Sequence, residues 1–388
     1  MGITSPPTKN VLVLDGMWNK SLAAVRALGT RGLAVTAGEQ TVFAAAIFSR
    51  YCARRVIYPS PVSSPKRFMR WLLRELEARP YDMVLPTEYQ TQQLLTANRE
   101  AVEALTRLPF ADNALVSKIH DKAWLLRHAT AAGIPCPATE FFDDISRLHA
   151  DFEYPVVIKP RESSGSRGIV YVKTKEAFIP AYMAVHAKYP NPIVQEYIPH
   201  GGAYGVGALF NMSCEPRAAF VYRRLREYPV SGGPSTLRES VRHNEIKEMA
   251  LHLLKTLSWK GLGHVEFRVD SRDNKPKLME VNPRVWGGLH LPIISGMDFP
   301  HLLYQMAMEG DIKPQWYYKT GVRCRWLIPA DALHLLSHLR RLKLPQGFFE
   351  SSDGDDIISA NDPLPVIGRI SSLLPLLYSP SMWKMLKR

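Results

Sequence analysis

The first hundred residues alternate between short apolar runs and amphipathic segments. The run NVLVLDG at 10–16 is followed at 21–37 by helical and then strand-like spacing of apolar residues. A second helical pattern at 67–80 leads into the apolar segment YDMVLPTEY at 81–89. Alternation of strands and helices predicts an open, mainly parallel sheet with helices on both faces. We therefore expect an α/β domain over residues 1–110.

The loop after the first strand does not carry a dinucleotide-binding fingerprint. It contains one glycine, Gly16, whereas that fingerprint needs three glycines at fixed spacing. An NAD site is therefore not expected here, and the first domain is interpreted as a scaffold.

The pattern changes from about residue 111. The segment at 121–139 predicts a helix that ends at a glycine and two prolines. Two strand-like segments at 154–160 and 169–173 then flank the Gly/Ser-rich tract ESSGSRG at 162–168. This tract predicts an antiparallel hairpin whose small, flexible tip can fold over a ligand.

Most of the remaining chain is strand-like up to about residue 315. The strand-like segments are 192–198, 204–211, 217–225, 263–270 and 276–282, and a helical pattern lies at 244–258. Together they predict an α+β domain with a mostly antiparallel sheet. The segment from 316 to 388 mixes helix-like pieces with prolines, and its pattern predicts no particular fold.

Composition and charge narrow the choice of function only slightly. A chain of 388 residues with 46% hydrophobic and 22% charged content is long enough for two or three globular domains. A formal charge of +13 attracts nucleic acid, anionic membranes and ATP alike, and it also fits a solvated basic surface. The chain contains no Lys/Arg-rich run and no aromatic RNA-binding signature, so nucleic-acid binding is not expected.

The cysteines and the N-terminus bear on the cellular compartment. The four cysteines are widely scattered, fit no metal spacing, and are interpreted as reduced thiols. The first ten residues lack the regions of a signal peptide, and no apolar run approaches the roughly 20 residues of a membrane span. A cytoplasmic protein is therefore expected. The leucines of the C-terminal tail are expected to pack on the protein core rather than on lipid.

Acidic and amide side chains occur on two strands that are predicted to be neighbours. VEFRVD carries Glu266, and MEVNPR carries Glu280 and Asn282, which strand alternation places on one face. Buried carboxylates are unfavourable unless they are paired or bind a cation, and two carboxylates with an amide oxygen suit Mg²⁺. The alternative is that Glu266 and Glu280 face solvent on a half-exposed sheet.

Basic side chains accompany this acidic group. Arg284 lies two positions past Asn282 and offers a rigid fork of donors for a carboxylate or a phosphoryl group. Lys159 ends the apolar strand VVIK, and Lys122 begins a helix after Asp121. Each lysine alone is typical of a solvated surface. Together with the Gly/Ser hairpin, the two lysines can surround the phosphates of a nucleotide.

The order Lys122, VVIKP, SSGSRG, QEYI, VEF and MEVNPR resembles the ATP-grasp superfamily, especially its carbamoyl-phosphate-synthase-like, carboxylate–amine ligase branch. The resemblance covers roughly residues 10–310. It implies a Rossmann-like pre-ATP-grasp domain at 1–110 and a two-lobed ATP-grasp domain at 111–315, with a lid subdomain at about 125–200. Residues 316–388 would then be a C-terminal extension.

The resemblance also implies roles for individual residues. Lys122 and Lys159 would contact ATP. The lid over the phosphates would contribute Ser164, Gly165, Ser166 and Gly168, and the hinge that contacts adenine would contribute Gln195, Glu196, Tyr197 and Ile198. Glu266, Glu280 and Asn282 would hold Mg²⁺, with Mn²⁺ as an alternative. Arg284 would bind the acyl phosphate or its carboxylate precursor, assisted by Arg224 and Arg226 of the stretch at 223–236. The acidic residue with which many members bind the ribose hydroxyls has no counterpart at 199–204.

By the same resemblance, the chain is expected to be an ATP-dependent, ADP-forming carboxylate–amine ligase. It would form an amide or peptide bond through an acyl phosphate, with a small-molecule carboxylate and an amine as partners. A homodimer is compatible with the sequence. Three alternatives stay open: an enzyme that uses bicarbonate or another carboxylate, a catalytically silent ATP-binding or sensing protein, and contact of the tail with a membrane surface.

Overall fold

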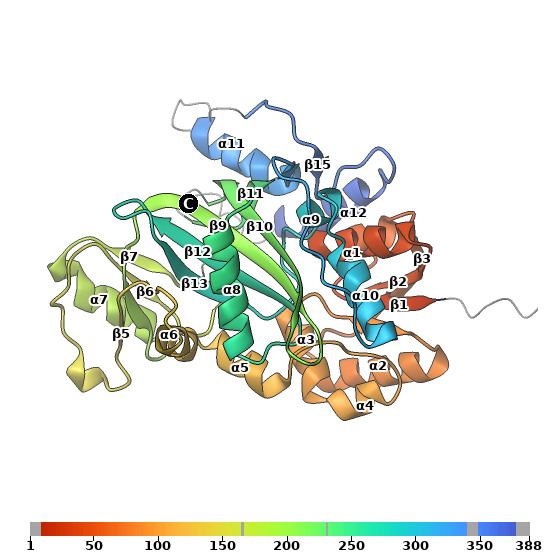
Figure 1. Ribbon diagram of the computed structural model, residues 1–388, viewed down its shortest axis with the longest axis horizontal. Helices are drawn as coiled ribbons and strands as arrows, with labels where there is room; N and C mark the ends of the chain where they lie inside the picture. The colour runs from red at the N-terminus through yellow and green to blue at the C-terminus, as the bar shows by residue number, and fades with distance from the viewer. Residues whose placement is uncertain (1–8, 164–166, 230–231, 340–347, 378–388) are drawn as a thin grey trace, which may run out of the picture.

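The structure, a computed structural model, describes residues 9–163, 167–229, 232–339 and 348–377. Its strands form three sheets, which Figure 1 shows along the longest dimension of the molecule. The N-terminal domain lies at the right of this view, the largest sheet lies in the middle, and a smaller lobe projects at the left.

A four-stranded parallel sheet forms the N-terminal domain, which confirms the arrangement predicted from the alternating pattern. Its strand order is β3-β2-β1-β4. The strands are β1 (Asn10–Val13), β2 (Ala34–Glu39), β3 (Cys52–Ile57) and β4 (Met83–Leu85). The accompanying helices are α1 (Asn19–Thr30), η1 (Ala45–Phe48), α2 (Pro65–Ala78), α3 (Tyr89–Ala97) and α4 (Arg99–Glu103).

The strand predicted at 81–89 is shorter in the structure because the chain turns after Leu85. The buried carboxylate of Asp15 accepts hydrogen bonds from the backbone N–H groups of Thr87 (2.9 Å) and Glu88 (2.8 Å). A side chain therefore satisfies two donors that a strand would direct into the sheet, and α3 begins at Tyr89.

A seven-stranded sheet forms the centre of the molecule, in the order β13-β12-β9-β10-β11-β14-β15. Its strands are β9 (His200–Phe210), β10 (Pro216–Glu227), β11 (Ser235–Ser240), β12 (Gly261–Asp270), β13 (Pro276–Asn282), β14 (Arg323–Arg325) and β15 (Gly354–Asp355). Helix α8 (Asn244–Thr256) covers it with the buried residues Ile246, Ala250, Leu253 and Leu254. Only β14 and β15 pair in parallel, so the prediction of a mostly antiparallel sheet is confirmed.

The smaller lobe contains a four-stranded antiparallel sheet in the order β5-β8-β6-β7. Its elements are β5 (Thr139–Phe141), η2 (Ile145–Arg147), β6 (Val156–Lys159), β7 (Val170–Val172), α7 (Lys175–His186) and β8 (Ile193–Glu196). It follows the helices α5 (Asn113–His120) and α6 (Lys122–Ala131). The antiparallel pairing of β6 with β7 confirms the predicted hairpin.

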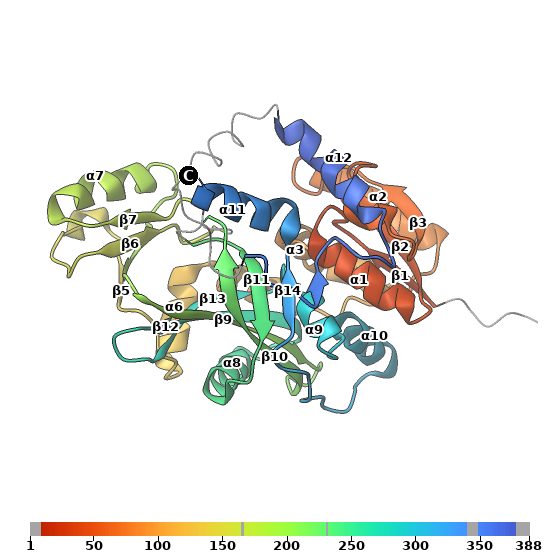
Figure 2. The ribbon, with the colours of Figure 1, turned by 90° about the horizontal axis from the view of Figure 1, so that it is seen from above.

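The chain after residue 315 joins both neighbouring regions. Strands β14 and β15 extend the central sheet beyond β11, whereas α12 (Pro365–Leu377) packs against η1 of the N-terminal domain. Figure 2 shows α11 (Ala332–Leu339) near β11 and α12 near the N-terminal domain. Helices α9 (His290–Ile294) and α10 (Phe299–Glu309) follow β13, and η3 (Leu327–Asp331) lies between β14 and α11.

One hydrophobic core joins the N-terminal domain to the central sheet. It contains Leu12 of β1, Phe220 of β10, and Trp286 and Phe299 from the segment after β13. Packing is thus continuous across the position near residue 110 where the sequence predicts a domain boundary.

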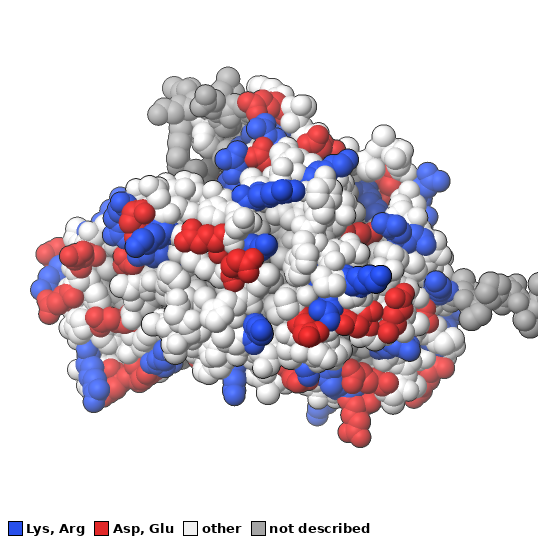
Figure 3. Space-filling model, viewed as in Figure 1, with Lys and Arg blue, Asp and Glu red and all other residues white. Residues whose placement is uncertain are grey.

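The face of the molecule shown in Figure 3 carries mixed charge. Lys and Arg side chains lie interspersed with Asp and Glu, so the formal charge of +13 does not gather in one patch on this face. No helix within the described ranges combines the length and the hydropathy that crossing a bilayer would need.

Candidate functional site

Two carboxylates and one amide meet on the neighbouring strands β12 and β13. Glu266 lies directly opposite Glu280 in the antiparallel pairing, which confirms their predicted placement on neighbouring strands. The Nδ2 of Asn282 donates to the Oε1 of Glu280 at 3.0 Å and lies 3.4 Å from the Oε1 of Glu266. All three side chains are partly buried. They therefore form one compact cluster, and their role as metal ligands stays a prediction.

The two carboxylates have different electrostatic surroundings. Burial raises the pKa of Glu266, although the guanidinium of Arg224 opposes this effect. Burial acts on Glu280 in the same direction, but Lys122 and the amide of Asn282 outweigh it and lower the pKa of Glu280. A divalent cation between the two carboxylates would stabilise the charged form of both.

The cluster fits Mg²⁺ by the chemistry of its donors. Carboxylate and amide oxygens are hard ligands, and Mg²⁺ takes one or two carboxylates together with phosphate oxygens and water. Among the residues that the structure describes, no group of three or more His, Cys, Asp or Glu side chains could hold a metal.

Two lysines face the same cluster, Lys122 from α6 and Lys159 from the end of β6 in the smaller lobe. Lys122 begins α6, where Asp121 caps the helix, and its Nζ donates to the carbonyl oxygen of Ser163 at 2.6 Å. The Nζ of Lys159 donates to the Oε1 of Gln195 at 2.5 Å. Burial, together with the charge of Lys122, lowers the pKa of Lys159 to about 8. The structure thus brings together two cations that lie 37 positions apart in the sequence.

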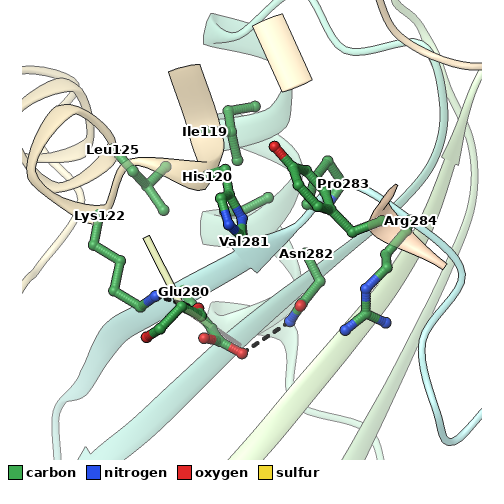
Figure 4. A pocket seen from close by; sticks show the side chains of 11 residues that line it. Ile119, His120, Lys122, Leu125, Glu280, Val281, Asn282, Pro283 and Arg284 are labelled. Atoms are coloured by element: carbon green, nitrogen blue, oxygen red, sulfur yellow. Dashed lines mark hydrogen bonds between the residues drawn. The ribbon is translucent and has the colours of Figure 1, made fainter. Parts of the chain in front are cut away.

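A pocket lies between these groups (Figure 4). Side chains from the N-terminal domain, the smaller lobe and β13 line it: Tyr89, Ile119, His120, Lys122, Leu125, Ser163, Glu280, Val281, Asn282, Pro283 and Arg284. Tyr89 and His120 stack on one another, with ring centroids 4.1 Å apart. Burial lowers the pKa of His120 to about 4, so its ring is neutral at pH 7. Neither residue was found from the sequence, because only the fold brings α3 against α5.

The N-terminal domain holds the segment that carries Arg284. The Nη1 of Arg284 donates to the carbonyl oxygen of Val285 at 2.9 Å, and the Nζ of Lys20 reaches the same oxygen at 3.3 Å. Lys20 also forms an ion pair with Glu88 at 2.5 Å. Gln92 of α3 donates to the carbonyl oxygen of the preceding Pro283 at 2.5 Å. The sequence analysis missed these supporting residues, which lie about 190 or more positions away from the segment that they hold.

The structure separates the two arginines predicted at 224 and 226. Arg224 forms an ion pair with Glu266 and so joins the acidic cluster. Arg226 instead forms two hydrogen bonds with the buried carboxylate of Asp331, at 3.0 and 2.9 Å. Residues two apart on a regular strand share a face, but the pairing of β10 with β11 shifts register between these two positions. Only Arg224 is therefore placed next to the predicted metal ligands.

The predicted hinge lies on β8 and just after it. Gln195 holds Lys159, and the carboxylate of Glu196 pairs with Lys277 (2.8 Å) and Arg272 (2.9 Å). Tyr197 contacts the lid residue Tyr171 edge to face, at a centroid distance of 6.0 Å, and Ile198 is buried. Contacts with Lys159, with Lys277 and Arg272, and with Tyr171 thus hold the hinge in place. Its contact with adenine stays a prediction.

The predicted lid is described only in part, because Ser164, Gly165 and Ser166 lie outside the described residues. Gly168 has a φ of +76°, and a Cβ added there would lie 2.7 Å from Pro160 and 2.8 Å from Tyr189. This position at the base of the hairpin therefore requires glycine.

Comparison with known proteins finds one matching family model and several solved structures of similar fold. A family model described as "ATP-grasp in the biosynthetic pathway with Ter operon" matches residues 193–328. The structure of biotin carboxylase from Campylobacter jejuni is similar with a TM-score of 0.67 at 15% identity, over 81% of this chain and 74% of that one. The L-amino acid ligase from Bacillus licheniformis gives a TM-score of 0.61 at 19% identity, over 80% and 78% of the two chains.

Sequence similarity to curated proteins is weaker and partial. D-alanine--D-alanine ligase from Dechloromonas aromatica (strain RCB) is 27% identical over 190 residues, which are 45% of this chain and 62% of that protein. The chain spans between 7% and 62% of the length of the curated relatives that it matches. The family model over residues 193–328 and the shared fold confirm the resemblance to the ATP-grasp superfamily.

Proposed function

We propose that the protein is an ADP-forming ligase that activates a carboxylate with ATP as an acyl phosphate and transfers the acyl group to an amine. The cluster of Glu266, Glu280 and Asn282, flanked by Lys122 on one side and by Arg224 on the other, carries this proposal. Such a cluster can hold the metal and the phosphates of ATP beside a cationic substrate site.

In the first step, the carboxylate oxygen attacks the γ-phosphorus and the bond to the β-phosphate oxygen breaks, which releases ADP. Lys122 and Lys159 bind phosphate oxygens and offset their growing charge. Arg284 and Arg224 orient the carboxylate and the transferred phosphoryl group. A bound Mg²⁺ supplies Lewis-acid stabilisation of the phosphate oxygens.

In the second step, a neutral amine attacks the acyl carbon, the bond from that carbon to the phosphate oxygen breaks, and the amine proton leaves with hydrogen phosphate. The acyl phosphate also reacts with water, so the hairpin of β6 and β7 would close over it. The stacked rings of Tyr89 and His120 line the pocket and would help to exclude water from it.

A second candidate reaction uses bicarbonate as the carboxylate. The fold is shared with a 2-oxoglutarate carboxylase domain whose structure holds MgADP and bicarbonate, at a TM-score of 0.67 and 14% identity. The same residues would serve this reaction, with carboxyl phosphate in place of a larger acyl phosphate. The two candidates differ in whether ADP release depends on bicarbonate or on an organic acid.

The test is ADP release by the full chain with MgATP, a panel of carboxylic acids, bicarbonate, and amines. Glu280→Gln should lower kcat by at least about 10²-fold, because the metal and the transferring phosphoryl group lose a charged ligand. Glu140→Gln removes an exposed carboxylate of the smaller lobe and should leave kcat unchanged. Formation of AMP and pyrophosphate, or full activity of Glu280→Gln, would contradict the proposal.

A further inference from the structure

Asp331, which immediately precedes α11, ties three strands of the central sheet together. Its buried carboxylate accepts hydrogen bonds from Arg226 of β10 at 3.0 and 2.9 Å. It also accepts from the hydroxyl of Thr236 on β11 at 2.7 Å and from the Nε of Arg325 on β14 at 2.7 Å. Two guanidinium groups and one hydroxyl therefore converge on a single carboxylate.

This anchor lies at the irregular end of β10. Arg224 pairs with Arg238 of β11, whereas Arg226 pairs with Leu237, so β10 has one residue more than β11 between these two pairs. A bulge of this kind turns the flanking side chains to different sides. Arg224 consequently reaches Glu266, and Arg226 points to Asp331.

Helix α11 makes a second contact with the same strand end. The Nδ1 of His334 is 2.8 Å from the carbonyl oxygen of Glu227, to which it donates. The carboxylate of Glu227 lies 3.4 Å from the Nη1 of Arg224. The segment after β14 thus contacts Arg226 and Glu227, which follow the bulge, and Glu227 in turn pairs with Arg224 before it.

We propose that Asp331 is a positioning residue that fixes the bulge of β10 and thereby holds Arg224 against Glu266. The C-terminal extension is then required for catalysis without touching ATP or substrate. This inference rests on the proposed function, in which Arg224 acts on the transferring phosphoryl group. Without the anchor, Arg226 would lose its buried partner and the pairing of β10 with β11 could slip by one residue, which would turn Arg224 away.

A double-mutant cycle with Asp331→Asn and Arg224→Ala tests the proposal. Asp331→Asn should lower kcat for ADP release about tenfold in the otherwise unchanged protein, and less than about twofold in the Arg224→Ala background. A purely structural role would give the same fold loss in both backgrounds. Equal losses, or full activity of Asp331→Asn, would therefore overturn the proposal.

Thr236→Val provides a milder version of the same change, in case Asp331→Asn does not fold. It removes one donor to Asp331 and should give a smaller loss that also disappears in the Arg224→Ala background. The control is Asp362→Asn, which removes another buried carboxylate of the C-terminal extension that pairs with Arg26. This control should lower stability, while kcat of the folded protein stays within about twofold in both backgrounds.

The affinity for a non-hydrolysable MgATP analogue, measured by isothermal titration calorimetry, gives a second readout of the same cycle that needs no acid or amine. Asp331→Asn should change this dissociation constant at least about threefold when Arg224 is present and leave it unchanged in Arg224→Ala. Absence of turnover with every substrate would thus count against the proposed function, whereas an identical shift of the affinity for the MgATP analogue in both backgrounds would refute the positioning role.

Discussion

Lys159 retains its positive charge less readily than an exposed lysine, because its ammonium group is buried and lies near Lys122. Its pKa is lowered to about 8, so the group is mainly charged at pH 7 and mainly neutral at pH 9. Only the charged form attracts phosphate. We therefore expect the dissociation constant of a non-hydrolysable MgATP analogue to rise as the pH rises through 8, by up to about tenfold per unit.

The matched variant for this prediction is Lys159→Arg. Arginine keeps its charge throughout this pH range, so the rise above pH 8 should flatten if Lys159 is its source. Isothermal titration calorimetry between pH 7 and 9.5 measures both proteins. An equally steep rise in the variant would assign the dependence to another group.

The residues of the acidic cluster could be predicted from the sequence, whereas the residues that support Arg284 could not. Glu280 and Asn282 are two positions apart in an apolar run, and strand alternation alone places them on one face. Lys20 and Gln92 support Arg284 through carbonyl groups of the chain around it. Such contacts leave no spacing in the sequence, because any donor on a neighbouring helix could make them.

Strand β9 carries glycines where other elements press against it. A Cβ added to Gly207 would lie 2.3 Å from the ring of Trp286, whereas a Cβ added to Gly287 would meet nothing within 4 Å. Gly207→Ala should therefore lower the free energy of unfolding by about 1–3 kcal/mol, because the buried ring must move. Gly287→Ala should change it by no more than about 0.5 kcal/mol.

Urea unfolding of both glycine variants provides the measurement. Trp286 follows Arg284 by two positions, so displacement of its ring should also weaken ADP release by the Gly207→Ala protein. Equal stability of the two variants would show that the sheet relaxes around the added methyl group.

The elements found from the sequence are those with strong apolar patterns. β13 coincides with the predicted segment at 276–282, β12 begins two residues before the one predicted at 263–270, and α6 begins at Lys122 as expected. The short strands β14 and β15 were not predicted, because two or three residues carry too little pattern. The bulge in β10 was missed for another reason, since it depends on pairing with β11 rather than on β10 itself.

At the scale of the whole molecule, the C-terminal extension is bound back to the N-terminal domain. The buried carboxylate of Asp362 accepts from the Nε of Arg26 at 2.9 Å, the hydroxyl of Ser49 at 2.7 Å and the backbone N–H of Arg50 at 2.8 Å. These contacts join residues more than 300 positions apart. Together with the shared core, these contacts hold the C-terminal extension and the central sheet against the N-terminal domain.

Asp362→Asn should consequently destabilise the protein by about 3 kcal/mol, because the buried guanidinium of Arg26 loses its charged partner. Glu103→Gln interrupts the more exposed ion pair with Arg99 and should cost less than about 1 kcal/mol. Chemical denaturation compares the two variants. Equal losses of unfolding free energy would mean that Asp362 contributes no more to stability than a surface carboxylate does.

The sequence by itself determined the alternation of elements, the order of the ATP-grasp motifs and the acidic pair with its amide, because these depend on local periodicity and residue type. Only the tertiary structure decided which arginine reaches Glu266, which helices support Arg284, and where the described residues after 315 pack. These features depend on strand register, on buried ion pairs and on packing between segments that are distant in the chain. Such contacts depend on which distant segments are buried against one another and which charges they pair, and a local sequence pattern does not predict this.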